Sequence, residues 1–164
     1  MLRIAIDPGA SGAIAWEHEG EVNAQKMPDT PTGIFECLKW MANIERFTGG
    51  KVECQVERVG GYMPGNSGPA AVTFARHCGH IDMALIALGI PTLTPVSPAV
   101  WQKAVCGALP KAEAKADKRA KAKAKQDRKN AIKDLMQRRY PHLKVTLNTA
   151  DALGILTYMM EHKV

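Results

Sequence analysis

Three acidic residues lie at chain positions that a fold can bring to one place. Asp7 ends an alternating apolar stretch, Glu57 ends a second such stretch, and Asp151 lies at the start of the last apolar helical stretch. Clustered carboxylates repel one another unless a divalent cation joins them, and oxygen-only ligands suit Mg²⁺, with Mn²⁺ as a substitute. Two ions held by shared carboxylates activate a water and stabilise the leaving oxygen of a phosphodiester. We therefore predict that Asp7, Glu57 and Asp151 are catalytic residues that ligate two metal ions.

Each of these carboxylates also has a structural explanation. Asp7 precedes Pro8-Gly9, and an Asp before such a turn often bonds the turn backbone. Asp151 follows Asn148 by three residues, as in a capping box at a helix start. Glu57 could simply begin a solvated loop. Taken singly each residue is more readily structural, whereas two carboxylates at strand ends and one at a helix start together favour a shared site.

The apolar pattern predicts the elements that must hold these side chains. Alternation typical of strands covers residues 2–7, 12–16, 21–27, 51–57 and, briefly, 91–95. Helical spacing of apolar residues covers 32–47, 67–88, 97–105, 132–140 and 148–159. The stretch 111–129 is rich in Ala and Lys, with high helix propensity but no larger apolar stripe.

This order of elements predicts an α/β fold with a mixed five-stranded sheet flanked by helices. The first three strands follow one another through tight turns, which is typical of an antiparallel meander. The helix before strand 51–57 permits a crossover, so that this strand pairs in parallel with strand 2–7. Asp7 and Glu57 would then lie at the same carboxyl edge of the sheet, where open α/β sheets bind their ligands.

Positive charge is concentrated in one segment of this 164-residue chain. The chain has 22 Lys and Arg against 16 Asp and Glu, for a net charge of +6. Residues 110–140 contain 12 Lys and Arg and only four Asp and Glu, so the remainder of the chain is slightly acidic. Such a segment indicates a polyanionic partner, with nucleic acid favoured over a membrane surface. No apolar run approaches the roughly 20 residues of a membrane helix, which disfavours a membrane protein.

The cysteines indicate a reducing compartment. None of the four is spaced as C-x-x-C, and three fall inside apolar patterns, as is typical of buried free thiols: Cys37, Cys54, Cys78 and Cys106. His77, Cys78 and His80 have metal-like types but lack a fourth ligand and a familiar zinc spacing. With no secretory signal pattern at the N-terminus, we expect a cytoplasmic protein.

The segments that carry this chemistry resemble, in order and over nearly the whole chain, the motifs of RuvC-type Holliday junction resolvases in the RNase H-like superfamily. They are Ile4-Ala5-Ile6-Asp7-Pro8-Gly9 with Gly12, Val56-Glu57 before a loop and a long helix, Val100-Trp101-Gln102-Lys103-Ala104-Val105-Cys106-Gly107, and Asn148-Thr149-Ala150-Asp151-Ala152-Leu153. Asp-Pro-Gly and Asp-Ala-Leu are weak signals alone, and it is their order and spacing that carry the resemblance.

The resemblance implies an RNase H-like fold, a homodimer and Mg²⁺-dependent paired nicking of four-way DNA junctions, without a nucleotide cofactor. By position, Asp7, Glu57 and Asp151 would be the metal ligands. Asn148 stands where the family usually has an acid; its amide oxygen can ligate a metal without adding charge, so Asn148 remains a catalytic candidate. We expect a single domain over 1–164 with a Lys-rich helical insertion at about 110–129, a region where phage-borne and organellar relatives vary.

Candidate DNA contacts fall in the basic segment and in the loop after Glu57. They are Lys129, Lys125, Lys103, Arg128, Arg58, Tyr62 and Met63, with Lys129 the foremost. Lysines that neutralise phosphates give salt-dependent affinity without a base code, and an aromatic residue can stack on an unpaired base. The alternatives are a solvated helix and a Tyr62 packed on the glycines of its own loop. The three tryptophans are interpreted as core or dimer residues.

Three other functions fit parts of the pattern. A related nuclease could cut flaps or forks, and a non-catalytic junction-binding protein of the same fold is favoured by Asn148. Residues 7–12, Asp-Pro-Gly-Ala-Ser-Gly, also resemble the phosphate loop of actin-like kinases and ATPases. Those proteins need two such lobes and a much longer chain, which disfavours the last alternative.

Overall fold

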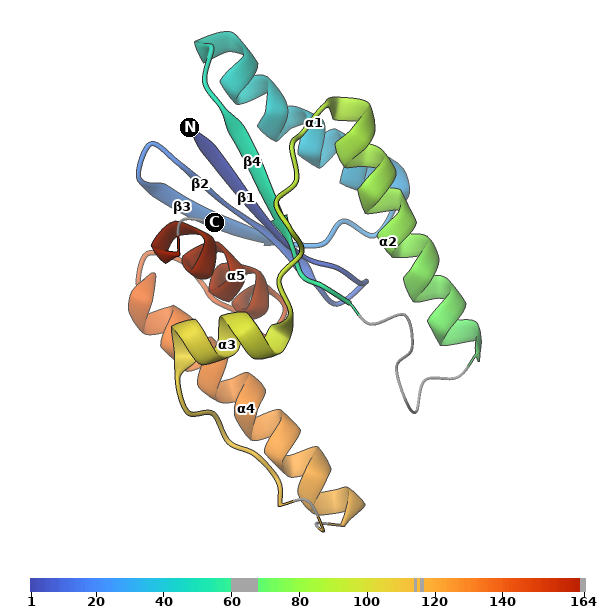
Figure 1. Cartoon of the computed structure of the whole chain (residues 1–164), viewed down its shortest axis with the longest axis vertical. Helices are drawn as coiled ribbons and strands as arrows, with labels where there is room; N and C mark the ends of the chain where they lie inside the picture. Colours follow the sequence, from blue (N-terminus) through green and yellow to red (C-terminus); the bar gives the residue numbers. More distant parts are fainter. Residues whose placement is uncertain (60–67, 114, 116, 163–164) are drawn as a thin grey trace.

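A computed structural model of the chain describes residues 1–59, 68–113, 115 and 117–162, without the side chains of 45–48. Its strands are β1 (Leu2–Asp7), β2 (Ala13–His18), β3 (Glu21–Lys26) and β4 (Val52–Val56). Its helices are α1 (Pro31–Thr48), α2 (Gly68–Leu88), α3 (Pro98–Cys106), α4 (Lys118–Arg139) and α5 (Thr149–Glu161). The strands form one sheet in the order β3-β2-β1-β4, with α1 and α2 against one face and α3, α4 and α5 on the other (Figure 1).

The strand register brings two of the predicted carboxylates to one edge of the sheet. β1 pairs antiparallel with β2, so that Asp7 lies opposite Ala13, and it pairs in parallel with β4, so that Ile6 lies opposite Val56. The Glu57 N–H continues this ladder by donating to the Ile6 carbonyl at 2.9 Å. The predicted meander and the parallel crossover are therefore confirmed, and Asp7 and Glu57 lie at the carboxyl ends of neighbouring strands.

Side-chain alternation then decides which face of the sheet carries the site. Even-numbered apolar residues of β1 and β4, such as Ile6 and Cys54, are buried against α1 and α2. Odd-numbered residues of β1 face α5, and there Ala5 and Ala15 are small enough for α5 to pack closely across β1 and β2. Because Asp7 and Glu57 are also odd-numbered, their side chains emerge on the α5 face.

The prediction of a fifth strand over 91–95 is wrong among the residues that the structure describes. This segment runs beside β4 in parallel but makes only isolated bridges, at Thr92 and Val96. The Leu93 N–H donates to the Cys54 carbonyl, and the next donor in the ladder would come from Pro95, which has no N–H. Val96, one residue later, donates to the Val56 carbonyl instead, so the register slips and the ladder is interrupted.

The Lys-rich stretch from Lys118 onward and the apolar stretch after it form one helix, α4, whereas the described residues of 110–117 are not helical, so the predicted insertion is helical only in its second part. The Asp117 side chain caps its start by accepting a hydrogen bond from the Ala120 N–H at 2.7 Å. In the second half of α4 the side chains of Ile132 and Met136 are buried, whereas most residues of the first half are exposed. The Tyr140 hydroxyl at its end lies 2.7 Å from the Thr157 hydroxyl of α5, so the apolar half holds α4 on the helix that carries Asp151.

Among the described helices, none combines the length and the apolar character needed to cross a membrane.

Candidate active site

An open cavity of about 560 Å³ lies at the carboxyl edge of the sheet, on the α5 side. Asp7 reaches it from β1, Glu57 from the end of β4, and Asp151 from the first turn of α5. Lys129 of α4 and Asn148 also border it. The structure therefore brings together five residues that the sequence singled out, from four distant parts of the chain, and we call this space the acidic cavity.

The β1–β2 loop shapes one side of the acidic cavity and depends on glycine. Gly9 has φ +116°, a conformation that other residues rarely adopt. At Gly12 a Cβ atom would overlap the Asp7 carbonyl, because the Gly12 N–H folds back onto the Gly9 carbonyl at 2.9 Å. The glycines of the 7–12 segment are thus required by a tight loop directly after Asp7.

Burial and mutual repulsion dominate the electrostatics of Asp7. Desolvation, followed by the charges of Glu57 and Asp151, raises the pKa of Asp7 to about 8, although the Lys129 ammonium opposes this shift. Without a cation, the buried carboxylates are thus held together at an electrostatic cost.

The pKa values of the other two carboxyls are raised as well. Burial, as the largest effect, raises the pKa of Glu57 to about 7. A hydrogen bond from Trp101 lowers this pKa, and the charge of Asp151 raises it. Burial also raises the pKa of Asp151, which the nearby charges of Lys129 and Arg128 lower. Three half-buried acids that repel one another and supply only oxygen ligands fit a divalent cation.

The carboxylates border one cavity without converging on one point. Within the described ranges, no three His, Cys, Asp or Glu side chains lie close enough to hold a single ion as they stand. Mg²⁺ is commonly bound by one or two carboxylates, with water and substrate phosphate as its other ligands. The donor set therefore fits ions held by pairs of carboxylates better than one ion held by all three.

Asn148 does not cap α5 with its side chain, contrary to the sequence interpretation. Its Nδ2 donates instead to the Ser11 carbonyl at 2.6 Å, which ties the start of α5 to the β1–β2 loop. Thr146 and Thr149 exchange side-chain and backbone hydrogen bonds at the helix start and take over the capping. A carboxylate could not donate the bond that Asn148 makes, so this residue has a structural task that an acid at the same position would lack.

The other candidates for DNA contact are spread around the acidic cavity. Lys125 and Arg128 border a basic cleft on α4 together with Lys111 and Lys121. Lys103 is exposed in the last turn of α3, and Arg58 is exposed directly after Glu57. Tyr62 and Met63 lie outside the described residues.

Two neighbours of the carboxylates were not predicted from the sequence. Lys26 borders the acidic cavity from β3; because it pairs with Ala13, which pairs with Asp7, the strand register could have indicated it. Trp101, interpreted as a core or dimer residue, is fully buried and donates from Nε1 to Glu57 Oε1 at 2.8 Å. The only sequence signal for this bond is that a buried indole N–H needs some acceptor.

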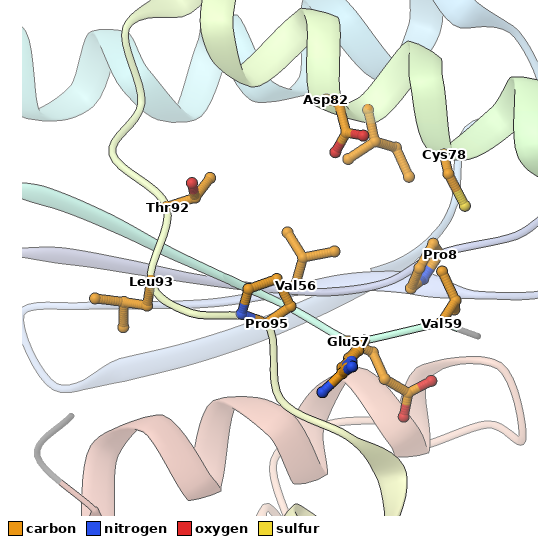
Figure 2. Close-up of a pocket in the computed structure, with 11 residues that line it drawn as sticks. Pro8, Val56, Glu57, Val59, Cys78, Asp82, Thr92, Leu93 and Pro95 are labelled. Carbon is orange, nitrogen blue, oxygen red and sulfur yellow. The ribbon is translucent and has the colours of Figure 1, made fainter. Parts of the chain in front are cut away.

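A second cavity, of about 230 Å³, lies between α2 and the end of β4. Figure 2 shows Asp82 and Cys78 of α2 on one side of the sheet, whereas the Glu57 side chain is directed away from them, toward α5. The Glu57 carboxylate is therefore directed to the acidic cavity, and the second cavity adjoins it, since Pro8, Glu57 and Val59 line both.

The chain is similar along its length to solved structures of RuvC from Thermus thermophilus. One structure of that protein is 17% identical to this chain, covers 99% of it and 96% of RuvC, and gives a TM-score of 0.52. A structure of T. thermophilus RuvC in complex with Holliday junction substrate is 16% identical, covers 99% of this chain and 97% of RuvC, and gives a TM-score of 0.55. Neither protein-family models nor curated proteins match the sequence. At this identity the similarity establishes the fold, which is the RNase H-like fold of RuvC.

Proposed function

Starting from the RuvC fold of this chain, we propose that it is a metal-dependent endonuclease that resolves four-way DNA (Holliday) junctions by paired nicking. The observation that carries the proposal is the acidic cavity, which Asp7, Glu57 and Asp151 border together at one edge of the sheet. The basic cleft on the neighbouring α4 supports a polyanionic substrate. The structural similarity to RuvC solved with a Holliday junction substrate supports the choice of junction.

We propose that Asp7, Glu57 and Asp151 hold two Mg²⁺ ions, with Mn²⁺ as a substitute. When bound, such ions supply an activated water and stabilise the charge that develops on the leaving oxygen. The chain contributes the arrangement: β1, β4 and α5 fix the carboxylates before substrate arrives, and Asn148 holds the β1–β2 loop beside them. Lys129 places one positive charge at the rim, where it can attract a phosphate.

One assay tests this function directly. Purified protein is incubated with synthetic junction, fork, flap and duplex DNA, with Mg²⁺ or with a chelator. We expect symmetric nicks in the junction only when the metal is present. Comparable cutting of forks and flaps would favour the broader branched-DNA nuclease, and junction binding without nicking would favour the non-catalytic protein.

We expect α4 to bind the phosphates that flank the scissile bond. Replacing Lys121 and Lys125 with Ala should weaken junction binding and reduce the slope of log affinity against log salt by about 2, because each phosphate contact contributes about one unit. The measurement is fluorescence anisotropy of a labelled junction over a series of salt concentrations, with a chelator present.

Lys39→Ala is the matched control for these variants. Lys39 lies on α1, on the opposite face of the sheet, where its ammonium is 3.4 Å from Glu36. It should leave the salt slope unchanged. An unchanged slope in the Lys121 and Lys125 variant would contradict phosphate binding by α4.

Paired nicking requires two sites, and α2 carries a surface suited to a second copy of the chain. Val72, Met83 and Ile86 are large apolar residues that are 60–70% exposed. With Gly79, where a Cβ would have no atom of the described residues within 4 Å, they follow a heptad-like spacing along one face. We propose that this α2 face forms a homodimer.

The Met83→Glu variant tests this dimer. A charge in a buried apolar seam is strongly unfavourable, so sedimentation equilibrium should show the mass fall from two chains to one, at unchanged secondary structure. Val100→Glu, which changes an exposed apolar residue on α3, is the control and should not alter the mass. A dimer that persists in Met83→Glu would place the interface elsewhere.

A further inference from the structure

We propose that Trp101 is a positioning residue, whose indole N–H holds the Glu57 carboxylate in the orientation in which the acidic cavity binds divalent cations. The inference rests on the proposed metal-dependent function and deepens it. It concerns a residue that the carboxylate motifs do not include and that does not itself border the acidic cavity.

The hydrogen bond has the geometry of a strong, directed contact. Trp101 Nε1 donates to Glu57 Oε1 at 2.8 Å, and the Trp101 side chain is completely buried. An indole N–H is a donor only and carries no charge, so it orients a carboxylate without repelling a cation. Because a carboxylate has two oxygens, one bond to Oε1 restricts the rotation of the group and leaves Oε2 available as a metal ligand.

The Trp101 ring is held rigidly between the two elements that supply metal ligands. On α5, a Cβ atom at Gly154 would overlap the Trp101 ring, so the ring packs directly against the helix backbone. Asp151 lies three residues before Gly154 and thus on the same side of α5. The ring therefore contacts both elements: it bonds Glu57 at the end of β4 and packs on the α5 backbone one turn after Asp151.

Positioning and simple core packing make different predictions. A buried Trp whose N–H merely needs an acceptor would, when altered, change stability and leave cation binding of the folded protein alone. A positioning residue changes cation affinity and turnover in a protein that is still folded, since partners that orient metal ligands typically contribute 10- to 100-fold to affinity or activity.

The test compares Trp101→Phe with wild type. Phe retains an aromatic ring against Gly154 but lacks the N–H. We expect Mn²⁺ affinity, measured by titration calorimetry on the DNA-free protein at constant pH, to fall by about 10-fold or more. The kcat for junction nicking should fall similarly, whereas the dissociation constant for junction in chelator should change by less than about twofold.

A second variant separates the N–H from the shape of the ring. Incorporating β-(3-benzothienyl)alanine at position 101 replaces the N–H with sulfur in a bicyclic ring of nearly the same size. We expect a near wild-type melting temperature with the same loss of Mn²⁺ affinity. Trp40→Phe, at an exposed residue of α1, controls for the loss of an indole elsewhere, and this variant should bind Mn²⁺ as wild type does.

The outcomes distinguish this inference from the proposed function. Wild-type Mn²⁺ affinity and kcat in the benzothienyl variant would overturn the role of Trp101 while the nuclease proposal stands. The converse result is also possible to recognise. If the wild-type protein binds Mn²⁺ but nicks no branched DNA, the nuclease proposal is rejected. If Mn²⁺ binding is nevertheless weaker in the benzothienyl variant, the positioning role of Trp101 is retained. A wild-type protein that binds no Mn²⁺ would overturn both.

Discussion

Replacing Asp7 with Asn is expected to slow junction nicking by at least about 1,000-fold while junction binding changes by less than about threefold. Asn has nearly the same shape as Asp but no charge, so its amide oxygen binds a divalent cation much more weakly than the carboxylate does. Asp7 is the most strongly coupled carboxylate of the acidic cavity, because both Glu57 and Asp151 act on it. Single-turnover nicking of a synthetic four-way junction, and its binding in chelator, measure the two effects.

The same substitution should stabilise the metal-free protein. Burial and the neighbouring carboxylates disfavour a charge at Asp7, and an amide carries none. Loss of activity with a raised melting temperature in chelator would therefore identify a functional residue rather than a damaged fold. Glu36→Gln, which makes the same carboxylate-to-amide change at an exposed residue of α1, is the control. Nicking at the wild-type rate by Asp7→Asn would remove Asp7 from the mechanism.

The stability of the metal-free protein should fall as the pH rises from about 5 to about 8. The folded state holds the pKa of Asp7 at about 8 and that of Glu57 at about 7, both above the ordinary values of 3.8 and 4.5. Between those limits the unfolded chain has released protons that the folded chain still binds. The free energy of unfolding therefore decreases as the pH rises through this range, and it levels off above the folded pKa values.

Saturating Mg²⁺ should oppose this loss. The cation binds the deprotonated carboxylates of the folded state, so its stabilising effect grows as the pH rises. Urea unfolding at several pH values, with Mg²⁺ or with a chelator, measures both curves. Asp7→Asn should flatten the curve in chelator. A metal-free stability that stays constant or increases over this pH range would contradict the electrostatics of the acidic cavity.

Local patterns determined much of the fold because they act within a few residues. The two-residue alternation of the first and fourth strands predicted their faces and, with one crossover, the common edge at which Asp7 and Glu57 lie. The fifth strand failed for a reason also present in the sequence: Pro95 has no N–H to continue the ladder.

The site was only partly predictable from the sequence. The positions of Asp7, Glu57 and Asp151 at element ends indicate a shared site, and the structure places all three at the acidic cavity; their catalytic role stays a prediction. Asn148 was assigned a cap because a helix follows it, yet its partner is Ser11, 137 residues away. Lys129 was expected to contact DNA, but the placement of its charge beside Asp7 depends on how α4 packs on α5.

The sequence by itself determined which residues carry charge, which faces of the strands are apolar, and which carboxylates end neighbouring strands. Only the tertiary structure decided that Trp101 bonds Glu57, that Gly154 admits the Trp101 ring, and that Asn148 secures the β1–β2 loop. Each of these contacts joins residues far apart in the chain. Their formation depends on packing distances between helices and the sheet, and periodicity along the chain contains no information about those distances.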